Sequence, residues 1–166
     1  NTMRDAVVYS SKTGNTKRLA EAVRAALGEA ECVYFGPPDP KALETRRLYV
    51  GFWTDKGTCD GASAAFLSTL EGKRVFLFGT AGFGGSEAYY QKILANVRTA
   101  IDASNTVVGE YMCQGRMPQA VRDRYVKMKE MPDAKPNLDA LIENFDQALS
   151  HPDQEDLERL RRMITG

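Results

Sequence analysis

Apolar and polar residues follow one another along the chain in two patterns, short continuous apolar runs and longer stretches with helical spacing. Short apolar runs bounded by turn residues predict buried strands, and apolar residues three and four apart predict amphipathic helices. Strands are expected at residues 6–9, 31–35, 47–53, 74–79 and 106–113, and helices at residues 15–27, 62–70 and 86–101. The alternation predicts an α/β fold, with a parallel sheet covered by helices on both faces.

Beyond residue 117 the strand pattern stops and helical patterns follow. Residues 119–131 are charged and permit a helix, residues 137–149 are amphipathic, and residues 155–163 predict a short charged helix. Ser150 is the expected cap of that last helix, with Pro152 in its first turn. We expect residues 1–166 to form one domain with a helical C-terminal part over residues 114–166. Residues 114–136 have two interpretations, a lid over a ligand or helices packed against the sheet.

Composition excludes several classes of protein. The chain of 166 residues has 22 basic and 22 acidic side chains, so no charge excess favours nucleic acid. Three separated cysteines and a single histidine predict no zinc site and indicate reduced thiols in a cytoplasmic protein. No apolar run approaches the length that spans a bilayer, and the first residues lack the apolar core of a signal peptide. The oligomeric state stays open.

The hydroxyl-rich segment "SSKTGNT", residues 10–16, lies between the first predicted strand and the first predicted helix. Backbone N–H groups at a helix start favour an anion, hydroxyl groups donate to phosphate oxygens, and Gly14 permits close approach of the backbone. A plain polar turn is the alternative. The glycine patterns of P-loops and of dinucleotide-binding turns are both absent, which favours a terminal phosphomonoester.

The run "VVYSSKTGNTKRLAEAV", residues 7–23, resembles the phosphate-loop signature of flavodoxins. The resemblance implies a flavodoxin-like three-layer sandwich, a five-stranded parallel sheet in the order 2-1-3-4-5, and bound FMN. It also implies which residues hold the FMN phosphate, namely Ser10, Ser11, Thr13, Gly14, Asn15 and Thr16. The stretches "VGFWTDKGTCD", "FLFGTAGFGGSEAYY" and "CQGRMP" are similar to a group of flavodoxin-like proteins in anaerobic bacteria, which we associate with the flavodoxin-like partner of bilirubin reductase.

Two further loops are expected to hold the flavin ring. They supply Phe52, Trp53, Thr54 and Gly57, and then Thr80, Ala81, Gly82, Phe83, Gly84 and Gly85. Trp53 at a strand end on this edge of the sheet is expected to stack on the ring, and a Trp without a ligand is the alternative. Many flavodoxins have Gly-Asp after this Trp, and here Thr54 takes the position where the peptide flips. A β-branched residue resists positive φ, so Gly57 is the alternative source of flexibility.

Several side chains near these loops keep two interpretations. Lys56 either lies close to the ring or is a solvated loop lysine. Flavodoxins often cover the outer flavin face with a Tyr, whereas this sequence has Gly84 and Gly85 there. Cys59 and Cys113 lack the arginine spacing of a phosphatase loop, so a structural role is the default for both.

The leading hypothesis is an FMN-binding electron-transfer protein that passes electrons to a redox partner, either a reductase or an acceptor enzyme. The zero net charge of this chain differs from the acidic surface that is usual in flavodoxins. Two alternatives stay open: an FMN-dependent reductase that acts directly on a quinone or tetrapyrrole-like substrate, and a non-catalytic FMN-binding accessory subunit. No metal site and no catalytic residue are predicted.

Overall fold

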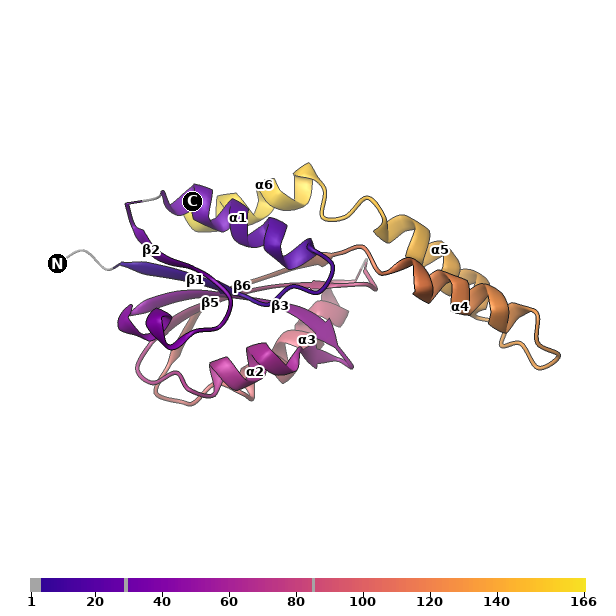
Figure 1. The fold of residues 1–166 in the computed structure, drawn as a ribbon, viewed down its shortest axis with the longest axis horizontal. Helices are drawn as coiled ribbons and strands as arrows, with labels where there is room; N and C mark the ends of the chain where they lie inside the picture. The colour runs from indigo at the N-terminus through magenta and orange to yellow at the C-terminus, as the bar shows by residue number, and fades with distance from the viewer. Residues whose placement is uncertain (1–3, 29, 85) are drawn as a thin grey trace.

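The computed structural model describes residues 4–28, 30–84 and 86–166. Five parallel strands form a sheet in the order β2-β1-β3-β5-β6 (Figure 1). The strands are β1 (Asp5–Tyr9), β2 (Cys32–Gly36), β3 (Arg47–Asp55), β5 (Arg74–Ala81) and β6 (Thr106–Gln114). The predicted strand order is confirmed. The sequence pattern missed β4 (Thr58–Cys59), a two-residue strand that pairs antiparallel with β3.

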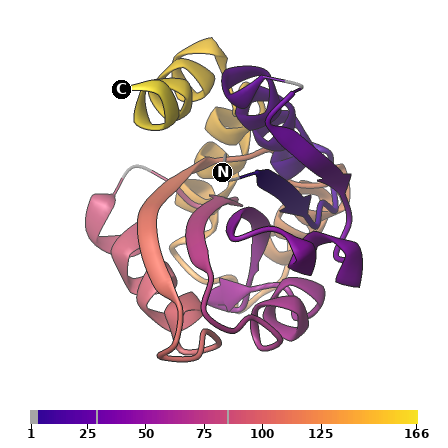
Figure 2. The ribbon, with the colours of Figure 1, turned by 90° about the vertical axis from the view of Figure 1, so that its left-hand side faces the viewer.

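Helices cover both faces of the sheet, as Figures 1 and 2 show. Helices α1 (Asn15–Leu27) and α6 (Gln154–Thr165) pack side by side on one face. Helices α2 (Gly61–Leu67) and α3 (Glu87–Arg98) lie on the other, and the short 3-10 helix η1 (Pro40–Glu44) joins β2 to β3. The α/β fold and the three-layer flavodoxin-like sandwich are therefore confirmed.

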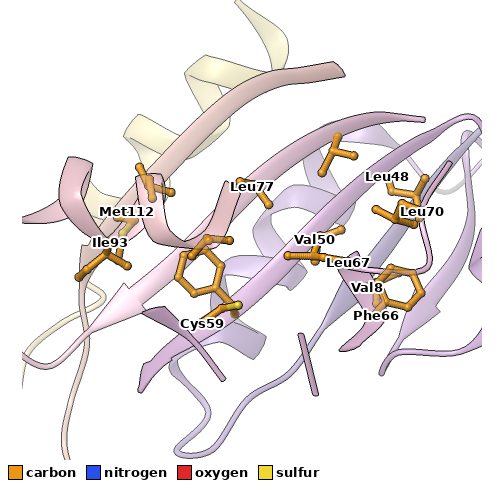
Figure 3. Close-up of a cluster of buried hydrophobic side chains, with 14 of the residues drawn as sticks. Val8, Leu48, Val50, Cys59, Phe66, Leu67, Leu70, Leu77, Ile93 and Met112 are labelled. Carbon is orange, nitrogen blue, oxygen red and sulfur yellow. The ribbon is translucent and has the colours of Figure 1, made fainter. Parts of the chain in front are cut away.

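Two apolar cores lie on opposite faces of the sheet, because successive strand residues point to opposite sides. Val8 packs in the cluster beneath α2 and α3, whereas its neighbour Val7 packs in the cluster beneath α1 and α6. Figure 3 shows the first cluster, with Phe66 and Ile93 meeting the sheet. Each central strand is buried on both faces, which explains its continuous apolar run.

Helices α4 (Gln119–Lys129) and α5 (Leu138–Ala148) form a hairpin that projects beyond the carboxyl ends of the strands (Figure 1). We call this pair of helices the hairpin. Ion pairs join its helices, Arg122 with Asp146 at 2.8 Å and Lys129 with Asp139. Among the described residues α4 packs mainly on α5, which does not support the interpretation of residues 114–136 as helices packed against the sheet.

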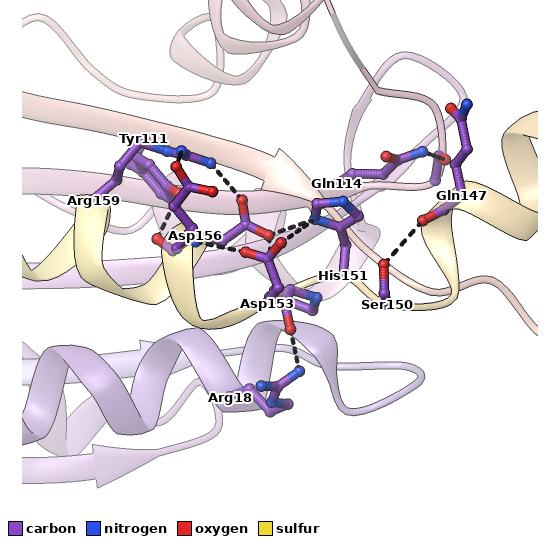
Figure 4. Close-up of polar contacts among 12 residues, drawn as sticks. Arg18, Tyr111, Gln114, Gln147, Ser150, His151, Asp153, Asp156 and Arg159 are labelled. Atoms are coloured by element: carbon purple, nitrogen blue, oxygen red, sulfur yellow. Dashed lines mark hydrogen bonds and ion pairs between the residues drawn. The ribbon is translucent and has the colours of Figure 1, made fainter.

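The start of α6 differs from the prediction. The cap is Asp153, not Ser150, and the carboxylate of Asp153 accepts the backbone N–H of Asp156 at 2.9 Å. In return the Asp156 carboxylate accepts the backbone N–H of Asp153 at 2.9 Å (Figure 4). This reciprocal pair is a capping box, which satisfies two N–H groups at once and so fixes where the helix begins. No helix among the described residues is long and apolar enough to cross a membrane.

Candidate functional site

A cavity of about 340 Å³ lies at the carboxyl ends of the parallel strands. Four segments meet around it: the 10–16 loop, the β3–β4 turn, the loop after β5 and the segment after β6. The sequence predicted cofactor-binding residues in the first three. Its lining residues are Lys12, Thr13, Asn15, Trp53, Thr54, Asp55, Lys56, Gly57, Thr80, Ala81, Gly82, Phe83, Tyr89, Gly115, Arg116, Met117 and Pro118. A crevice at this edge of an open α/β sheet is the usual ligand site of such folds.

The loop before α1 leaves the start of that helix open for an anion. Gly14 is the N-terminal cap residue, with φ of 89°, and neither a side-chain cap nor an acidic residue in the first turn is present. In contrast, α3 and α6 begin with side-chain caps, Ser86 and Asp153. Gly14 itself has no capping side chain, but the Ser11 hydroxyl oxygen accepts the backbone N–H groups of Gly14 at 3.1 Å and Lys17 at 3.3 Å. The backbone N–H groups of Asn15 and Thr16, which have no intrahelical acceptor, are the ones left for an anion. A helix start with this arrangement favours a phosphate group.

The remaining polar side chains of the loop point in two directions. The Thr13 hydroxyl and the Asn15 amide both donate to the Arg116 carbonyl, at 3.3 Å and 2.7 Å. Thr16 instead turns inward, where its hydroxyl donates to the Phe52 carbonyl at 3.0 Å, and its side chain is 1% exposed. The Thr16 hydroxyl therefore joins α1 to β3, and the prediction that this hydroxyl binds phosphate lacks support in the described geometry.

Five other predicted residues that the structure describes are absent from the cavity lining: Ser10, Ser11, Gly14, Phe52 and Gly84. The Phe52 side chain is 0% exposed in the core, and its ring fills the space that a side chain at Gly79 would need. Contact between this ring and a cofactor is thus ruled out in this conformation. The backbone N–H of Ser10 donates to the Gly51 carbonyl at 3.0 Å, which continues the strand pairing into the loop.

Trp53 forms one wall of the cavity near the end of β3. Its backbone N–H donates to the Asp60 carboxylate at 3.2 Å, and its carbonyl accepts the Asp60 N–H at 2.9 Å. The Lys12 ammonium lies 5.0 Å from the centre of the indole ring, within cation–π distance. These contacts fix the Trp53 backbone and place a positive charge beside its ring.

The turn after Trp53 differs from the expectation. Lys56 and Gly57 have φ values of 52° and 84°, so they are the two central residues of a tight β-hairpin turn. Thr54 lies in β3, paired with Cys59, and its hydroxyl donates to the Thr80 carbonyl at 2.8 Å. The expectation that Thr54 occupies the flipping turn is wrong, because the short strand β4 shifts the turn two residues along. The Gly57 carbonyl accepts the Asn96 side chain at 2.8 Å.

The glycines after β5 make room for neighbouring side chains. A Cβ atom on Gly82 would lie 2.5 Å from the Met117 sulfur, and one on Gly84 would lie 2.6 Å from the Gln114 side chain. Phe83 between them is 41% exposed at the edge of the cavity. Thr80 and Ala81 are buried, and Gly85 lies outside the described residues. The loop thus contacts the segment after β6 closely.

The sequence reasoning missed several contributors. Lys12 and Tyr89 line the cavity, as do Arg116, Met117 and Pro118. Burial raises the pKa of Tyr89. Tyr89 follows the glycine loop in the first turn of α3, so its position gave a usable signal, whereas Asn96 reaches the turn from 39 residues away without any local signal. Of residues 114–136, only 115–118 belong to the cavity lining, so the interpretation of the whole segment as a lid has support only at its start.

The cysteines take no part in the lining of the cavity. Cys59 and Cys113 are buried, and burial raises the pKa of the thiols of Cys32, Cys59 and Cys113. A thiol with a raised pKa stays protonated at neutral pH and is a poor nucleophile. The geometry thus agrees with the default structural role.

These residues fit a flavin mononucleotide. The cavity volume falls in the range of small-molecule sites, and Asn15, the first residue of α1, belongs to its lining. Trp53, Tyr89, Phe83 and Met117 provide apolar walls, and the Thr13, Asn15 and Thr54 side chains are polar residues of the lining. The site therefore defines a class of protein: an α/β protein that binds a phosphate-bearing planar ligand at the carboxyl edge of its sheet.

Comparisons with known proteins agree with this class. The family model for the flavodoxin domain matches residues 6–165, and the chain belongs to the flavodoxin family. A flavodoxin-like domain-containing protein named BilS from Clostridium symbiosum is 38% identical, over 98% of this chain and 94% of that protein. BilS from Clostridioides difficile is 28% identical, over 93% and 90%. Family membership supports FMN as the cofactor and confirms the resemblance seen in the sequence.

Solved structures support the fold. A short-chain flavodoxin associated with a non-canonical PDU bacterial microcompartment has a TM-score of 0.59 at 17% identity, covering 98% of this chain and 95% of that one. Oxidised flavodoxin 2 from Bacillus cereus has a TM-score of 0.56 at 13% identity, covering 97% and 94%. At this level of identity the likeness concerns the fold alone.

Proposed function

We propose that this chain is an FMN-binding electron-transfer protein that passes electrons to a separate redox enzyme. The observation that carries the proposal is the cavity at the sheet edge, which is lined by Asn15 at the start of α1 and by Trp53 at the end of β3. When bound, FMN would supply the ability to accept and release electrons. The chain would hold the phosphate through the 10–16 loop and position the ring between Trp53 and the 80–84 loop.

The proposed partner is a bilirubin reductase. The stretches around Trp53, Phe83 and Gln114 resemble the group of flavodoxin-like proteins associated with that enzyme, and two relatives carry the name BilS. The exposure of Phe83, at 41%, supports this role, because an exposed aromatic side chain at a cofactor edge provides apolar contact area for a partner.

An anaerobic stopped-flow experiment tests the proposal. The FMN-loaded protein is reduced with light and then mixed with bilirubin, with bilirubin reductase, or with both, while flavin absorbance is followed. We expect rapid reoxidation only when enzyme and bilirubin are both present. A colourless protein that ignores added FMN would contradict every flavin-based function.

The other outcomes distinguish the two alternatives. Reoxidation by bilirubin alone, or oxidation of NADH by the protein alone, would favour a reductase that acts directly. Activation of bilirubin reductase without any change in flavin absorbance would favour a non-catalytic accessory subunit. The same three mixtures therefore separate carrier, enzyme and accessory subunit.

A further inference from the structure

The carbonyl group of Gly82 accepts hydrogen bonds from two side chains that come from outside its own loop. The Gln114 amide donates to it at 3.0 Å and the Asn144 amide donates at 3.1 Å. The Gln114 amide also donates to the Asn144 side-chain oxygen at 3.1 Å, so the three groups form a closed set. Asn144 belongs to α5, 62 residues further along the chain, and the cavity lining does not include it.

This contact fixes the direction of one peptide group beside the flavin cavity. The N–H and the C=O of a trans peptide point in opposite directions. Holding the Gly82 carbonyl toward α5 turns the N–H of Phe83 away from α5, and both Gly82 and Phe83 line the cavity. We propose that Asn144 is a positioning residue, which keeps the Phe83 N–H directed at the ring of the bound flavin.

The side chains around the loop leave few other groups that could hold the Gly82 carbonyl in the place of Asn144. Met117 and Gln114 fill the space next to Gly82 and Gly84, so the loop has little room to change its path. Gln114 reaches the same carbonyl, but Asn144 is also the acceptor that orients the Gln114 amide. Removal of the Asn144 side chain therefore takes away one donor to the Gly82 carbonyl and also the acceptor that orients the other donor, Gln114. Both effects weaken the hold on this carbonyl, because linked hydrogen bonds support one another. The inference rests on the proposed binding of FMN in this cavity.

Flavin titrations of Asn144→Ala test the proposal. Binding is followed by fluorescence quenching with two probes, FMN and riboflavin, since riboflavin has the ring but no phosphate. We expect Asn144→Ala to weaken both probes by the same factor, roughly tenfold, the size of a lost hydrogen-bonding contact. The matched control is Glu143→Gln, an exposed neighbour on the same helix, which should leave both affinities unchanged. Thr13→Val in the phosphate loop should weaken FMN alone.

A second variant and a second readout keep the proposal testable if the alanine variant folds poorly. Asn144→Asp keeps the acceptor for Gln114 and places a carboxylate oxygen against the Gly82 carbonyl, so it should bind riboflavin more weakly than wild type. In amide NMR spectra of the wild type, the Phe83 N–H signal should move on addition of riboflavin, and this movement should shrink in both variants. Circular dichroism checks that the fold is retained.

The outcomes separate this inference from the proposed function. A wild-type chain that binds neither probe contradicts FMN binding itself. Wild-type binding with unchanged affinities in Asn144→Ala overturns the positioning role, and so does a loss that affects FMN but not riboflavin. A Phe83 signal that ignores riboflavin in the wild type overturns it as well.

Discussion

The sheet with its covering helices and the projecting hairpin are stabilised in different ways. In the sheet region, Val7, Val8 and Phe52 are each 0% exposed within large shared clusters. In the hairpin, α4 has no buried residue, and α5 buries Leu138, Phe145 and Ala148 outside both clusters. Apolar burial therefore determines the fold of the first region, whereas the second is a small separate unit.

Polar contacts attach the base of the hairpin to the candidate site. Arg116 donates through its side chain to the Leu149 carbonyl at 3.1 Å, and its own carbonyl accepts the Asn15 side chain at 2.7 Å. Asn144 reaches the Gly82 carbonyl, as described above. The hairpin thus contacts the ring loop directly through Asn144, and Arg116 links the residue after α5 to the phosphate loop. A unit outside the two main cores can therefore still take part in positioning the cofactor.

The largest expected effect comes from the core of the sheet. Phe52→Ala removes a ring that is 0% exposed, and we expect the free energy of unfolding to fall by about 4 kcal/mol. Val126→Ala on α4, where the side chain is 38% exposed, is the control and should change it by less than about 0.5 kcal/mol. Urea unfolding measures both. Similar losses for the two variants would contradict the proposed difference between the regions.

The hairpin should open separately from the sheet. Phe145→Ala removes the 0% exposed ring of α5, and we expect the opening of the hairpin to become easier by about 3 kcal/mol. Hydrogen exchange should accelerate over residues 119–148 and stay unchanged in β3 and β5. Equal acceleration in the central strands would show that the hairpin and the sheet unfold as one unit.

Substitutions at Thr16 and Thr13 separate an effect on stability from an effect on cofactor binding. Thr16→Val leaves the buried Phe52 carbonyl without the hydroxyl at 3.0 Å, so we expect a loss of stability of about 1–3 kcal/mol. The Thr13 hydroxyl is an exposed donor to the Arg116 carbonyl at 3.3 Å, and Thr13→Val should affect stability little. Thermal unfolding without flavin checks both. A larger loss in Thr13→Val would contradict the inward role of Thr16.

The continuous apolar runs were enough to predict the strands of the sheet, because a strand buried on both faces has apolar residues at successive positions. Val7 and Val8 illustrate this, as they enter opposite cores. The loops were also predictable, since parallel strands bring their carboxyl ends to one edge. The direction of individual side chains was not: Thr16 has the same hydroxyl as Thr13 but points inward. Contacts such as those of Asn96 and Asn144 depend on packing between distant elements, and no local pattern encodes them.

The smallest predicted effect lies where the hairpin rejoins the sheet region, at the start of α6. The backbone N–H of Asp156 lowers the pKa of the Asp153 carboxyl, so the carboxylate cap stabilises the fold above the ordinary pKa of about 4. We expect Asp153→Ala to lower the free energy of unfolding by about 1 kcal/mol at pH 7. This difference should shrink as the pH falls below about 4, because the protonated carboxyl is a weaker acceptor in the wild type.

Ser86→Ala is the matched control for that cap. The Ser86 hydroxyl accepts the backbone N–H of Tyr89 at 3.2 Å at the start of α3, and a hydroxyl does not titrate in this range. Its loss should therefore cost a similar amount at pH 7 and at pH 3, measured by urea unfolding of both variants. A pH-independent loss in Asp153→Ala would contradict the charged cap.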